Sequence, residues 1–246
     1  MTTSLKSTFN KKGFFLIKNI FDKKILINLI KDIETSDDVD KYFDQANKLR
    51  RIERLYNKSD LLNKVNNDIL NILEKVFGVK YTIFKDKYNA KPPGGEGFYA
   101  HFDGVFKFID ENNNEKNGWY EYSNNFINVL VALDPCNEKN GTIEIADRFN
   151  GNFNELYEIT QKNGTPNIIE NVEKKLNFEK IILNAGDIVV FSNTCPHRSK
   201  KNNSEINRKT LYYTYTPLKD GSKYLDYFRD KSKSKNNTSK SLSGEI

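Results

Sequence analysis

From Tyr81 onward the sequence consists of short apolar or alternating runs separated by turn residues, and this texture limits the possible folds more than any other feature. Runs of this length are typical of β-strands that bury at least one face. They predict strands near residues 81–91, 126–133, 142–145, 180–183, 188–191 and 209–216. Asn140-Gly141, between two of the runs, favours a tight hairpin turn. We therefore expect the main body of the chain to be a double-sheet β fold.

Two helices are predicted before the first of these strands. Asp22 is a suitable N-cap, and apolar residues follow it at helical spacing (Ile25, Leu26, Leu29, Ile30 and Ile33). A second helix is expected after Ser59, and Gly78 lies where a helix C-terminus commonly has a glycine. Helices first and strands afterwards indicate an α+β chain whose N-terminal helices pack on one sheet.

The length and composition fit one domain with a polar tail. A chain of 246 residues is within the size of a single β-rich domain, which we place at residues 1–230. Residues 231–246 are rich in Lys, Ser and Asn and offer little to bury, so we expect a mobile tail there. Cys136 and Cys195 have neither CxxC spacing nor the density of a disulfide scaffold, and no run approaches the length of a membrane span. These features predict a soluble cytoplasmic protein with no membrane partner.

The net charge of +6 comes mostly from lysines that are spread along the chain. A nucleic-acid footprint requires basic residues that gather on one surface, so scattered lysines are weak evidence for one. We expect no nucleic-acid partner, although the charge keeps a nucleic-acid demethylase among the alternatives. An anionic small-molecule substrate is also compatible with it.

Only two histidines occur in the chain, and each lies in a polar cluster. His101-Phe102-Asp103 places an imidazole and a carboxylate two residues apart, so on a strand both point to the same face while Phe102 turns away. His197 lies just beyond the predicted strand 188–191. Two imidazoles and one carboxylate form the ligand set of many non-haem Fe(II) oxygenases. Three coordination positions then stay free, enough for a bidentate 2-oxo acid and O2.

Ser199 and Arg208 supply what such a cosubstrate needs. A guanidinium pairs in bidentate fashion with the far carboxylate of a 2-oxo dicarboxylate, and a nearby hydroxyl adds a hydrogen bond. Arg208 opens the predicted strand 209–216, eleven residues after His197. An arginine at the start of a strand is structural in most proteins. Arg208 is therefore evidence for a cosubstrate site only because it occurs together with His197.

The pattern H-x-D, followed by H-x-S and a later arginine, resembles the phytanoyl-CoA dioxygenase-like family of Fe(II)/2-oxoglutarate-dependent oxygenases. The resemblance extends to residues 13–17, 84–95, 140–144 and 186–191. It implies a double-stranded β-helix (jelly-roll) core. A narrower similarity to the branch that acts on small aminophosphonates is carried by residues 85–98, 208–217 and 227–231. The chain departs from that branch at Phe102, where glutamine is commoner.

The resemblance assigns His101, Asp103 and His197 to Fe(II), and these three residues are the implied catalytic set. Halogenating relatives replace the carboxylate with a small residue, so the retention of Asp103 implies a hydroxylase.

The resemblance also assigns Ser199 and Arg208 to 2-oxoglutarate. Asn89 and Lys85 fall where pocket residues near the cosubstrate often lie in the family. O2 is the second cosubstrate that this chemistry requires.

The substrate that the resemblance implies is a small polar or anionic metabolite, with 2-aminoethylphosphonate or a related aminophosphonate as the first candidate. An amino acid, a betaine or an acyl-CoA are alternatives for the same chemistry. A catalytically silent jelly-roll binding module is the alternative from another class of protein, and the intact ligand set argues against it.

Residues 110–125 are polar and rich in asparagine, which predicts either a substrate lid or an ordinary solvated loop. Trp119, Tyr120 and Tyr122 lie within this segment. Such a cluster either covers a substrate or anchors the loop in the core.

Overall fold

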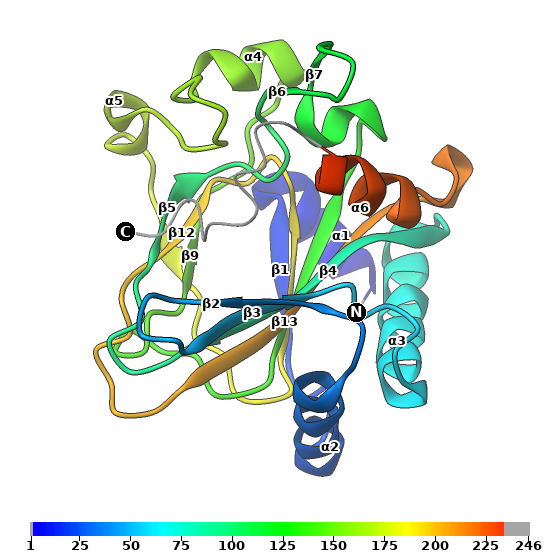
Figure 1. Cartoon of the computed structure of the whole chain (residues 1–246), viewed down its shortest axis with the longest axis vertical. Helices are drawn as coiled ribbons and strands as arrows, with labels where there is room; N and C mark the ends of the chain where they lie inside the picture. The colour runs from blue at the N-terminus through cyan, green and yellow to red at the C-terminus, as the bar shows by residue number, and fades with distance from the viewer. Residues whose placement is uncertain (1, 234–246) are drawn as a thin grey trace.

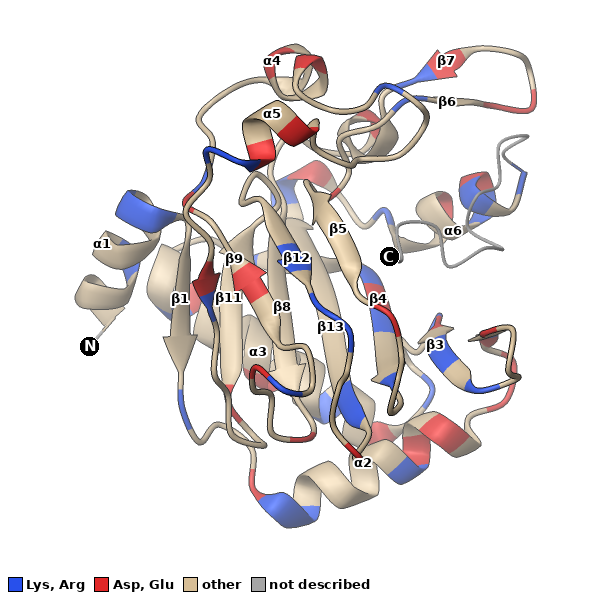
Figure 2. Cartoon of the chain, turned by 90° about the vertical axis from the view of Figure 1, so that its left-hand side faces the viewer, with Lys and Arg blue, Asp and Glu red and all other residues tan. Residues whose placement is uncertain are grey.

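Two facing antiparallel sheets form the centre of the computed structural model, which describes residues 2–233 (Figure 1). The larger sheet has the order β1 (Phe14–Ile17), β11 (Ile188–Ser192), β8 (Ile127–Ala132), β13 (Arg208–Pro217), β4 (Tyr81–Lys91), β3 (Leu49–Glu53) and β2 (Asp40–Phe43). The smaller sheet has the order β10 (Glu179–Lys180), β9 (Ile143–Ile145), β12 (His197–Ser199) and β5 (Phe98–His101). Figure 2 shows the smaller sheet in front of the larger one. The predicted double-sheet body is therefore present.

Helices lie outside this pair of sheets. The outer face of the larger sheet contacts α1 (Thr2–Lys12), α2 (Lys23–Thr35), α3 (Asp60–Phe77) and α6 (Tyr224–Lys233). One end of the molecule carries α4 (Phe153–Glu158), α5 (Glu170–Glu173) and a small hairpin of β6 (Phe108–Ile109) and β7 (Glu115–Lys116) (Figure 1). Short 3-10 turns cover Gly118–Glu121 and Leu218–Asp220.

Alternation along the strands separates two faces of the larger sheet. Outward-facing residues such as Val129 and Tyr213 pack against the helices in the main core. Inward-facing Leu130 and Val189 instead meet Ile145 of the smaller sheet in a second apolar cluster. Along β4 and β13 many inward positions are polar, and there the space between the sheets becomes a cavity rather than a core.

Both predicted N-terminal helices are confirmed, together with their caps. The Asp22 carboxylate accepts from the backbone N–H of Ile25, and the Ser59 hydroxyl accepts from that of Leu62. Gly78 ends α3 in the left-handed region, with φ of 71°. The helix α1 was not predicted, because only Phe9 of its residues is buried and no apolar stripe marks it.

Two details of the strand prediction were wrong, and a helix extends into the first residues of the predicted tail. Asn140-Gly141 forms a turn but not a hairpin, because β8 and β9 on either side of it belong to different sheets. The predicted strand at 180–183 is reduced to β10, which ends at Lys180; Ile181 still donates to the Ile143 carbonyl oxygen, and Leu183 then pairs with Cys136. The helix α6 continues through Lys233, past the predicted start of the tail, and residues 234–246 lie outside the described part of the chain.

The segment 110–125 contains more structure than a loop. It includes β7 and the turn Gly118–Glu121, and Trp119 is buried in the main core with its ring 5.4 Å from those of Phe84 and Phe126. Trp119 also lines the cavity. The aromatic cluster therefore anchors this segment and at the same time forms a wall of the cavity.

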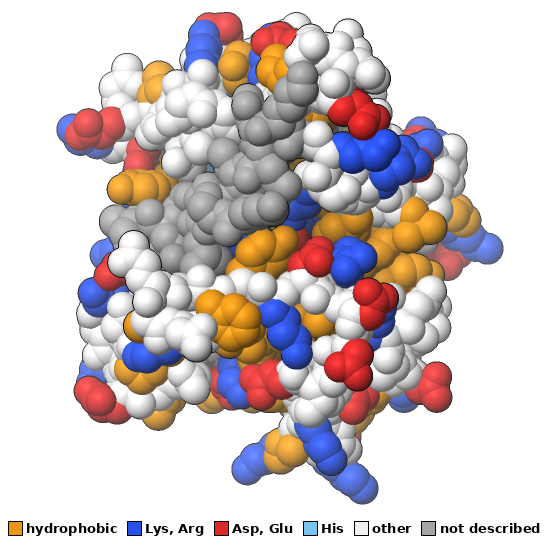
Figure 3. Space-filling model, in the orientation of Figure 1, with side chains coloured by type: hydrophobic (Ala, Val, Ile, Leu, Met, Phe, Trp, Pro, Cys, Tyr) orange, Lys and Arg blue, Asp and Glu red, His pale blue; other side chains and the backbone are white. Residues whose placement is uncertain are grey.

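The surface carries both signs of charge. On the face drawn in Figure 3, lysines and arginines are interspersed with acidic side chains, as scattered lysines in the sequence predict. None of the helices in residues 2–233 combines the length and apolarity needed to cross a bilayer.

Asp86 is a buried carboxyl on the helix-facing side of β4, and it makes the stability of the fold depend on pH. It accepts from the Leu55 N–H and the Tyr224 hydroxyl, each at 3.0 Å. Burial raises the pKa of Asp86 to about 6, and these hydrogen bonds only partly oppose the rise. The folded state therefore keeps a proton that the unfolded chain loses near pH 4. Its contribution to stability is present below pH 4 and is lost as the pH rises through 6.

We expect Asp86→Asn to gain stability relative to the wild type between pH 4.5 and pH 8, by about 2 kcal/mol. Urea unfolding of both proteins in EDTA at the two pH values measures this difference, and titrations common to both proteins cancel. An equal difference at both pH values would show that Asp86 does not titrate in this way.

Candidate active site

The two histidines lie side by side on neighbouring strands of the smaller sheet. His101 ends β5 and His197 begins β12, the two are Cα partners, and their ring centroids are 4.1 Å apart. Asp103 follows two residues after His101. Its carboxylate oxygens lie 4.0 Å from Nε2 of His101 and 3.6 Å from Nε2 of His197. The three ligand atoms are within 4.8 Å of one another, so one ion can contact all of them.

Hydrogen bonds aim the donor atoms of the cluster. Nδ1 of His101 is 2.8 Å from the Tyr99 carbonyl oxygen, and Nδ1 of His197 is 3.1 Å from that of Cys195. With Nδ1 protonated and donating, the lone pair of each Nε2 is available to a metal. Cys195 therefore contributes a backbone carbonyl, while its thiol is buried in the apolar cluster between the sheets.

A residue of the larger sheet orients the Asp103 carboxylate. Asn128 on β8 donates its side-chain N–H to Oδ2 of Asp103 at 2.9 Å and accepts from the Thr214 hydroxyl at 2.8 Å. Phe102 points away, into a separate cluster where its ring meets that of Phe149 edge-on at 5.5 Å. The predicted alternation of this tripeptide is confirmed.

The protonation states suit a divalent cation. Burial, with the neighbouring His197, lowers the pKa of His101 to about 3, and burial also lowers that of His197. Burial would raise the pKa of Asp103, but His197 and Lys87 outweigh it and hold the pKa below its usual value. At neutral pH the cluster therefore presents two neutral imidazoles and one carboxylate. This donor set fits Fe(II), with room left for further ligands.

A cavity of about 420 Å³ opens in front of the cluster. Ser199, the last residue of β12, and Arg208, the first residue of β13, both line it. Arg208 is buried, with an exposed fraction of 4%, and its Nε has no hydrogen-bond partner among the described residues. Its guanidinium contacts Tyr212 and Cys136, and it acts on the Asp134 carboxyl only at a distance, without an ion pair within 4 Å. A buried cation that makes no ion pair indicates a site for an anionic ligand.

The structure brings most of the predicted site residues together. His101, Asp103, His197, Ser199, Arg208, Asn89 and Lys85 all line the cavity. Asn89 faces it with a buried side-chain oxygen that has no partner within residues 2–233. Lys85 lies at the other end of β4 from Lys91, the strand partner of Arg208, about 20 Å along the strand at ~3.3 Å per residue. The cavity therefore contains Lys85 without placing it beside Arg208 and Ser199.

Sequence reasoning missed several residues around the site. The Lys91 ammonium donates to the Ser199 hydroxyl oxygen at 2.9 Å and to the Lys200 carbonyl oxygen at 2.6 Å. Alternation from Asn89 would have placed Lys91 on the same face of β4. Asn128 and Tyr212 come from separate strands, and no local pattern points to them.

Gly104, directly after Asp103, has a backbone conformation that favours glycine. Its φ is +82°, and a Cβ there would lie 2.6 Å from the Trp119 ring. A larger residue would be strained and would also push Trp119 out of place. Glycine at this position thus lets an aromatic wall stand directly beside the metal cluster.

Solved structures share this fold across most of the chain. EctD from S. alaskensis, solved with 2-oxoglutarate and 5-hydroxyectoine, superposes with a TM-score of 0.68 at 14% identity and covers 89% of this chain and 77% of its own. The non-heme alpha ketoglutarate dependent epimerase SnoN from nogalamycin biosynthesis gives 0.67 at 14% identity, with 92% and 89% covered. These likenesses confirm the predicted jelly-roll core with helices packed on one sheet.

Two curated relatives are named as phosphonate oxygenases. A 2-aminoethylphosphonate dioxygenase from the uncultured bacterium HF130_AEPn_1 is 28% identical over 164 residues, 66% of this chain and 56% of its own length. A methylphosphonate hydroxylase from Gimesia maris is 30% identical over 159 residues, 65% of this chain and 54% of its own. The match thus spans little more than half of each relative.

The family model described as phytanoyl-CoA dioxygenase (PhyH) matches residues 9–210. This range contains the metal cluster, Ser199 and Arg208, and it confirms the family predicted from sequence. The predicted cofactors, Fe(II) and 2-oxoglutarate, agree with the donor set and with the uncompensated arginine. Because the match extends over most of its length, the chain belongs to the phytanoyl-CoA dioxygenase family.

Proposed function

We propose that this protein is an Fe(II)- and 2-oxoglutarate-dependent dioxygenase that hydroxylates a small anionic metabolite, with phosphonates as the leading substrate class. The observation that carries the proposal is the meeting, in one cavity, of three metal donors with a buried arginine that forms no ion pair among the described residues. The names of the two curated relatives support the substrate class.

In this proposal His101, Asp103 and His197 hold the iron. When bound, Fe(II) together with O2 and 2-oxoglutarate supplies the oxidation, in which 2-oxoglutarate becomes succinate and CO2 and the substrate gains a hydroxyl group. The contribution of the chain is to orient the ligands. Asn128 fixes one carboxylate oxygen, and two backbone carbonyls fix the imidazoles.

Arg208 and Ser199 hold the far carboxylate of 2-oxoglutarate. Because the Lys91 ammonium donates to the Ser199 oxygen, the hydroxyl proton of Ser199 is free to be donated to a ligand. Arg208 then supplies the charge, and its planar group supplies bidentate geometry. Asn89 contributes an amide on the adjacent strand.

The rest of the cavity favours an anionic substrate over a betaine, which carries a quaternary ammonium group. Asp103 is the only acidic residue among the described residues that line it, and that carboxylate is committed to the metal. Aromatic residues form much of the remaining wall, including Trp119, Tyr122 and Tyr227. Such a wall excludes water from the reacting groups.

Binding of 2-oxoglutarate tests the proposal without a known substrate. Under argon, adding 2-oxoglutarate to the Fe(II)-loaded protein should produce a weak visible charge-transfer absorption, because the keto acid chelates the iron. Succinate, which lacks the keto group, is the matched control and should produce none. A protein that holds Fe(II) and shows no band at saturating 2-oxoglutarate would contradict the proposal.

A further inference from the structure

Four cations line the part of the cavity that β3, β4 and α6 form. Lys85 and Lys87 are inward residues of β4, Arg51 is on β3, and Lys231 reaches the cavity from α6. Residues 85, 87 and 89 alternate along β4, so their side chains point into the same space. In the register of the sheet Arg51 lies opposite Asn89. The cluster formed by these four residues is called the cationic end below.

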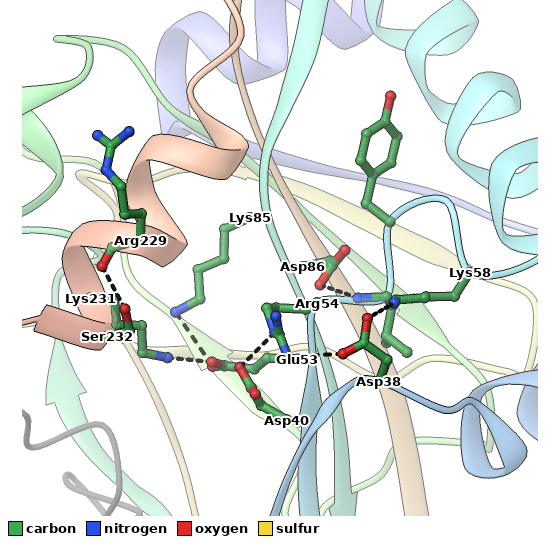
Figure 4. Close-up of polar contacts among 12 residues, drawn as sticks. Asp38, Asp40, Glu53, Arg54, Lys58, Lys85, Asp86, Arg229, Lys231 and Ser232 are labelled. Atoms are coloured by element: carbon green, nitrogen blue, oxygen red, sulfur yellow. Dashed lines mark hydrogen bonds and ion pairs between the residues drawn. The ribbon is translucent and has the colours of Figure 1, made fainter.

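The Glu53 carboxylate forms ion pairs with three of these cations. Glu53 is fully buried, with its oxygens 3.7 Å from the Lys85 ammonium and 3.8 Å from the Arg51 guanidinium, and it accepts a hydrogen bond from Lys231. Figure 4 shows Lys85 from β4 and Lys231 from α6 converging on it. Burial would raise the pKa of Glu53, but Lys85, Lys231 and Arg51 outweigh it and hold the pKa at about 2. The carboxylate therefore stays ionised.

The cationic end keeps an excess of positive charge even so. Four cations less one carboxylate leave three charges, and Glu53 itself does not line the cavity. Lys87 has no hydrogen bond and no ion pair within 4 Å among the described residues, although its charge acts on Asp103; its ammonium lies 4.8 Å from the centroid of the Tyr212 ring. The buried Nε of Arg51 is also without a partner within residues 2–233. Donors left unmatched in a cavity indicate an anionic ligand that completes them.

Aromatic side chains separate this charge from bulk water. The Lys85 ammonium lies 5.6 Å from the Trp119 ring centroid and 5.3 Å from that of Tyr227. These rings suit a short apolar stem next to an anionic head. A substrate ammonium would find four like charges here, and the carboxylate that these cations share, Glu53, does not line the cavity.

We propose that Arg51, Lys85, Lys87 and Lys231 bind a dianionic phosphonate or phosphate head of the substrate, and that the substrate requires no amino group. This inference rests on the proposed dioxygenase function, whose site it extends. Lys85 lies about 20 Å along β4 from Lys91, the strand partner of Arg208, so the head of the substrate has room apart from the far carboxylate of the cosubstrate. Lys85 and Lys87 both act electrostatically on Asp103, so a substrate held by them lies next to the metal cluster.

Trp119 provides a direct readout, because it is the only tryptophan in the chain and lies beside Lys85. We would titrate the EDTA-treated full-length protein with n-propylphosphonate and with 2-aminoethylphosphonate and follow tryptophan fluorescence. These probes have the same chain length and differ in a methyl group against an ammonium. The inference predicts saturable binding of n-propylphosphonate at least as tight as that of 2-aminoethylphosphonate. The reverse order, by tenfold or more, would overturn it.

Variants locate the head group. Lys87→Gln and Lys231→Gln should each weaken n-propylphosphonate binding about 10- to 100-fold, the range for one charge-assisted hydrogen bond. Lys233→Gln is the matched control, because Lys233 is also on α6 and pairs with Glu111 at the surface. It should bind as the wild type does. Unchanged binding in both cavity variants, with circular dichroism showing intact folds, would place the head elsewhere and overturn the inference.

Further probes distinguish a phosphonate head group from a phosphate ester. They also allow the dioxygenase function and the head-group site to be tested separately. Propyl phosphate binding as tightly as propylphosphonate would indicate a phosphate ester; weaker binding would indicate a phosphonate. Propanesulfonate, a monoanion, should bind more weakly than both, and equal binding would contradict recognition of a dianion. Because this titration uses no metal, anion binding without the 2-oxoglutarate band would refute the dioxygenase proposal alone. A band without anion binding would refute only the cationic end as a substrate site.

Discussion

Replacement of Asp103 by alanine is expected to remove Fe(II) binding and turnover together. Asp103 is the only carboxylate in the donor cluster, and the two neutral imidazoles that remain give an ion no charge compensation. Removing a residue that hydrogen-bonds to a metal ligand typically lowers metal affinity about 10- to 100-fold. Removing the ligand itself should therefore lower Fe(II) affinity by more than about 100-fold. Equilibrium dialysis with Fe(II) under argon, and succinate formation in air, measure the two effects.

A graded series makes this prediction specific. Asn128→Ala should weaken Fe(II) binding about 10- to 100-fold, because it removes the N–H that orients the Asp103 carboxylate. Asp147→Ala is the control, since Asp147 is exposed just after β9 and does not line the cavity. It should leave Fe(II) affinity unchanged. If Asp103→Ala bound Fe(II) as well as Asp147→Ala does, the assigned metal site would be wrong.

Replacement of Arg208 by glutamine should raise the KM for 2-oxoglutarate by roughly 30- to 4,000-fold while Fe(II) affinity is kept. Removing one partner of a buried charge pair costs about 2–5 kcal/mol, and each 1.4 kcal/mol is a factor of ten. Initial rates of succinate formation against 2-oxoglutarate concentration measure the change. Arg208→Lys should recover part of the loss, because an ammonium restores the charge but not the bidentate geometry.

Arg198 provides a matched control for this experiment. It borders the same cavity, but Glu144 and Glu173 each accept a hydrogen bond from its guanidinium at 2.8 Å. Its charge is already compensated, so Arg198→Gln should leave the KM for 2-oxoglutarate within about twofold. Equal losses in both variants would point to a general electrostatic effect rather than a carboxylate site at Arg208.

Local sequence signals predicted the parts of this structure that local physics determines. Asp22 and Ser59 cap their helices because a side-chain oxygen satisfies an exposed N–H within three residues. Alternation placed His101 and Asp103 on one face and Phe102 on the other. Scarcity of histidine then left His197 as the second nitrogen donor.

Features that depend on pairing between distant segments were not predictable in this way. Asn140-Gly141 has the composition of a hairpin turn, yet it connects two sheets, because β8 pairs with β11 and β13 instead of β9. The positions of Asn128 and Lys231 at the site depend on which strands and helices become neighbours. Lys85 was expected near the cosubstrate, but distance along β4 places it at the cationic end.

The central claim is that the metal cluster, Arg208 and the cavity together couple 2-oxoglutarate consumption to hydroxylation of a phosphonate. The direct measurement is ³¹P NMR of short alkylphosphonates incubated with the Fe(II)-loaded protein, 2-oxoglutarate and O2, with succinate quantified in the same samples. The account predicts a new hydroxyphosphonate signal and succinate in equimolar amounts, with both absent in Asp103→Ala. Protein that holds Fe(II) and 2-oxoglutarate but hydroxylates no phosphonate would contradict it.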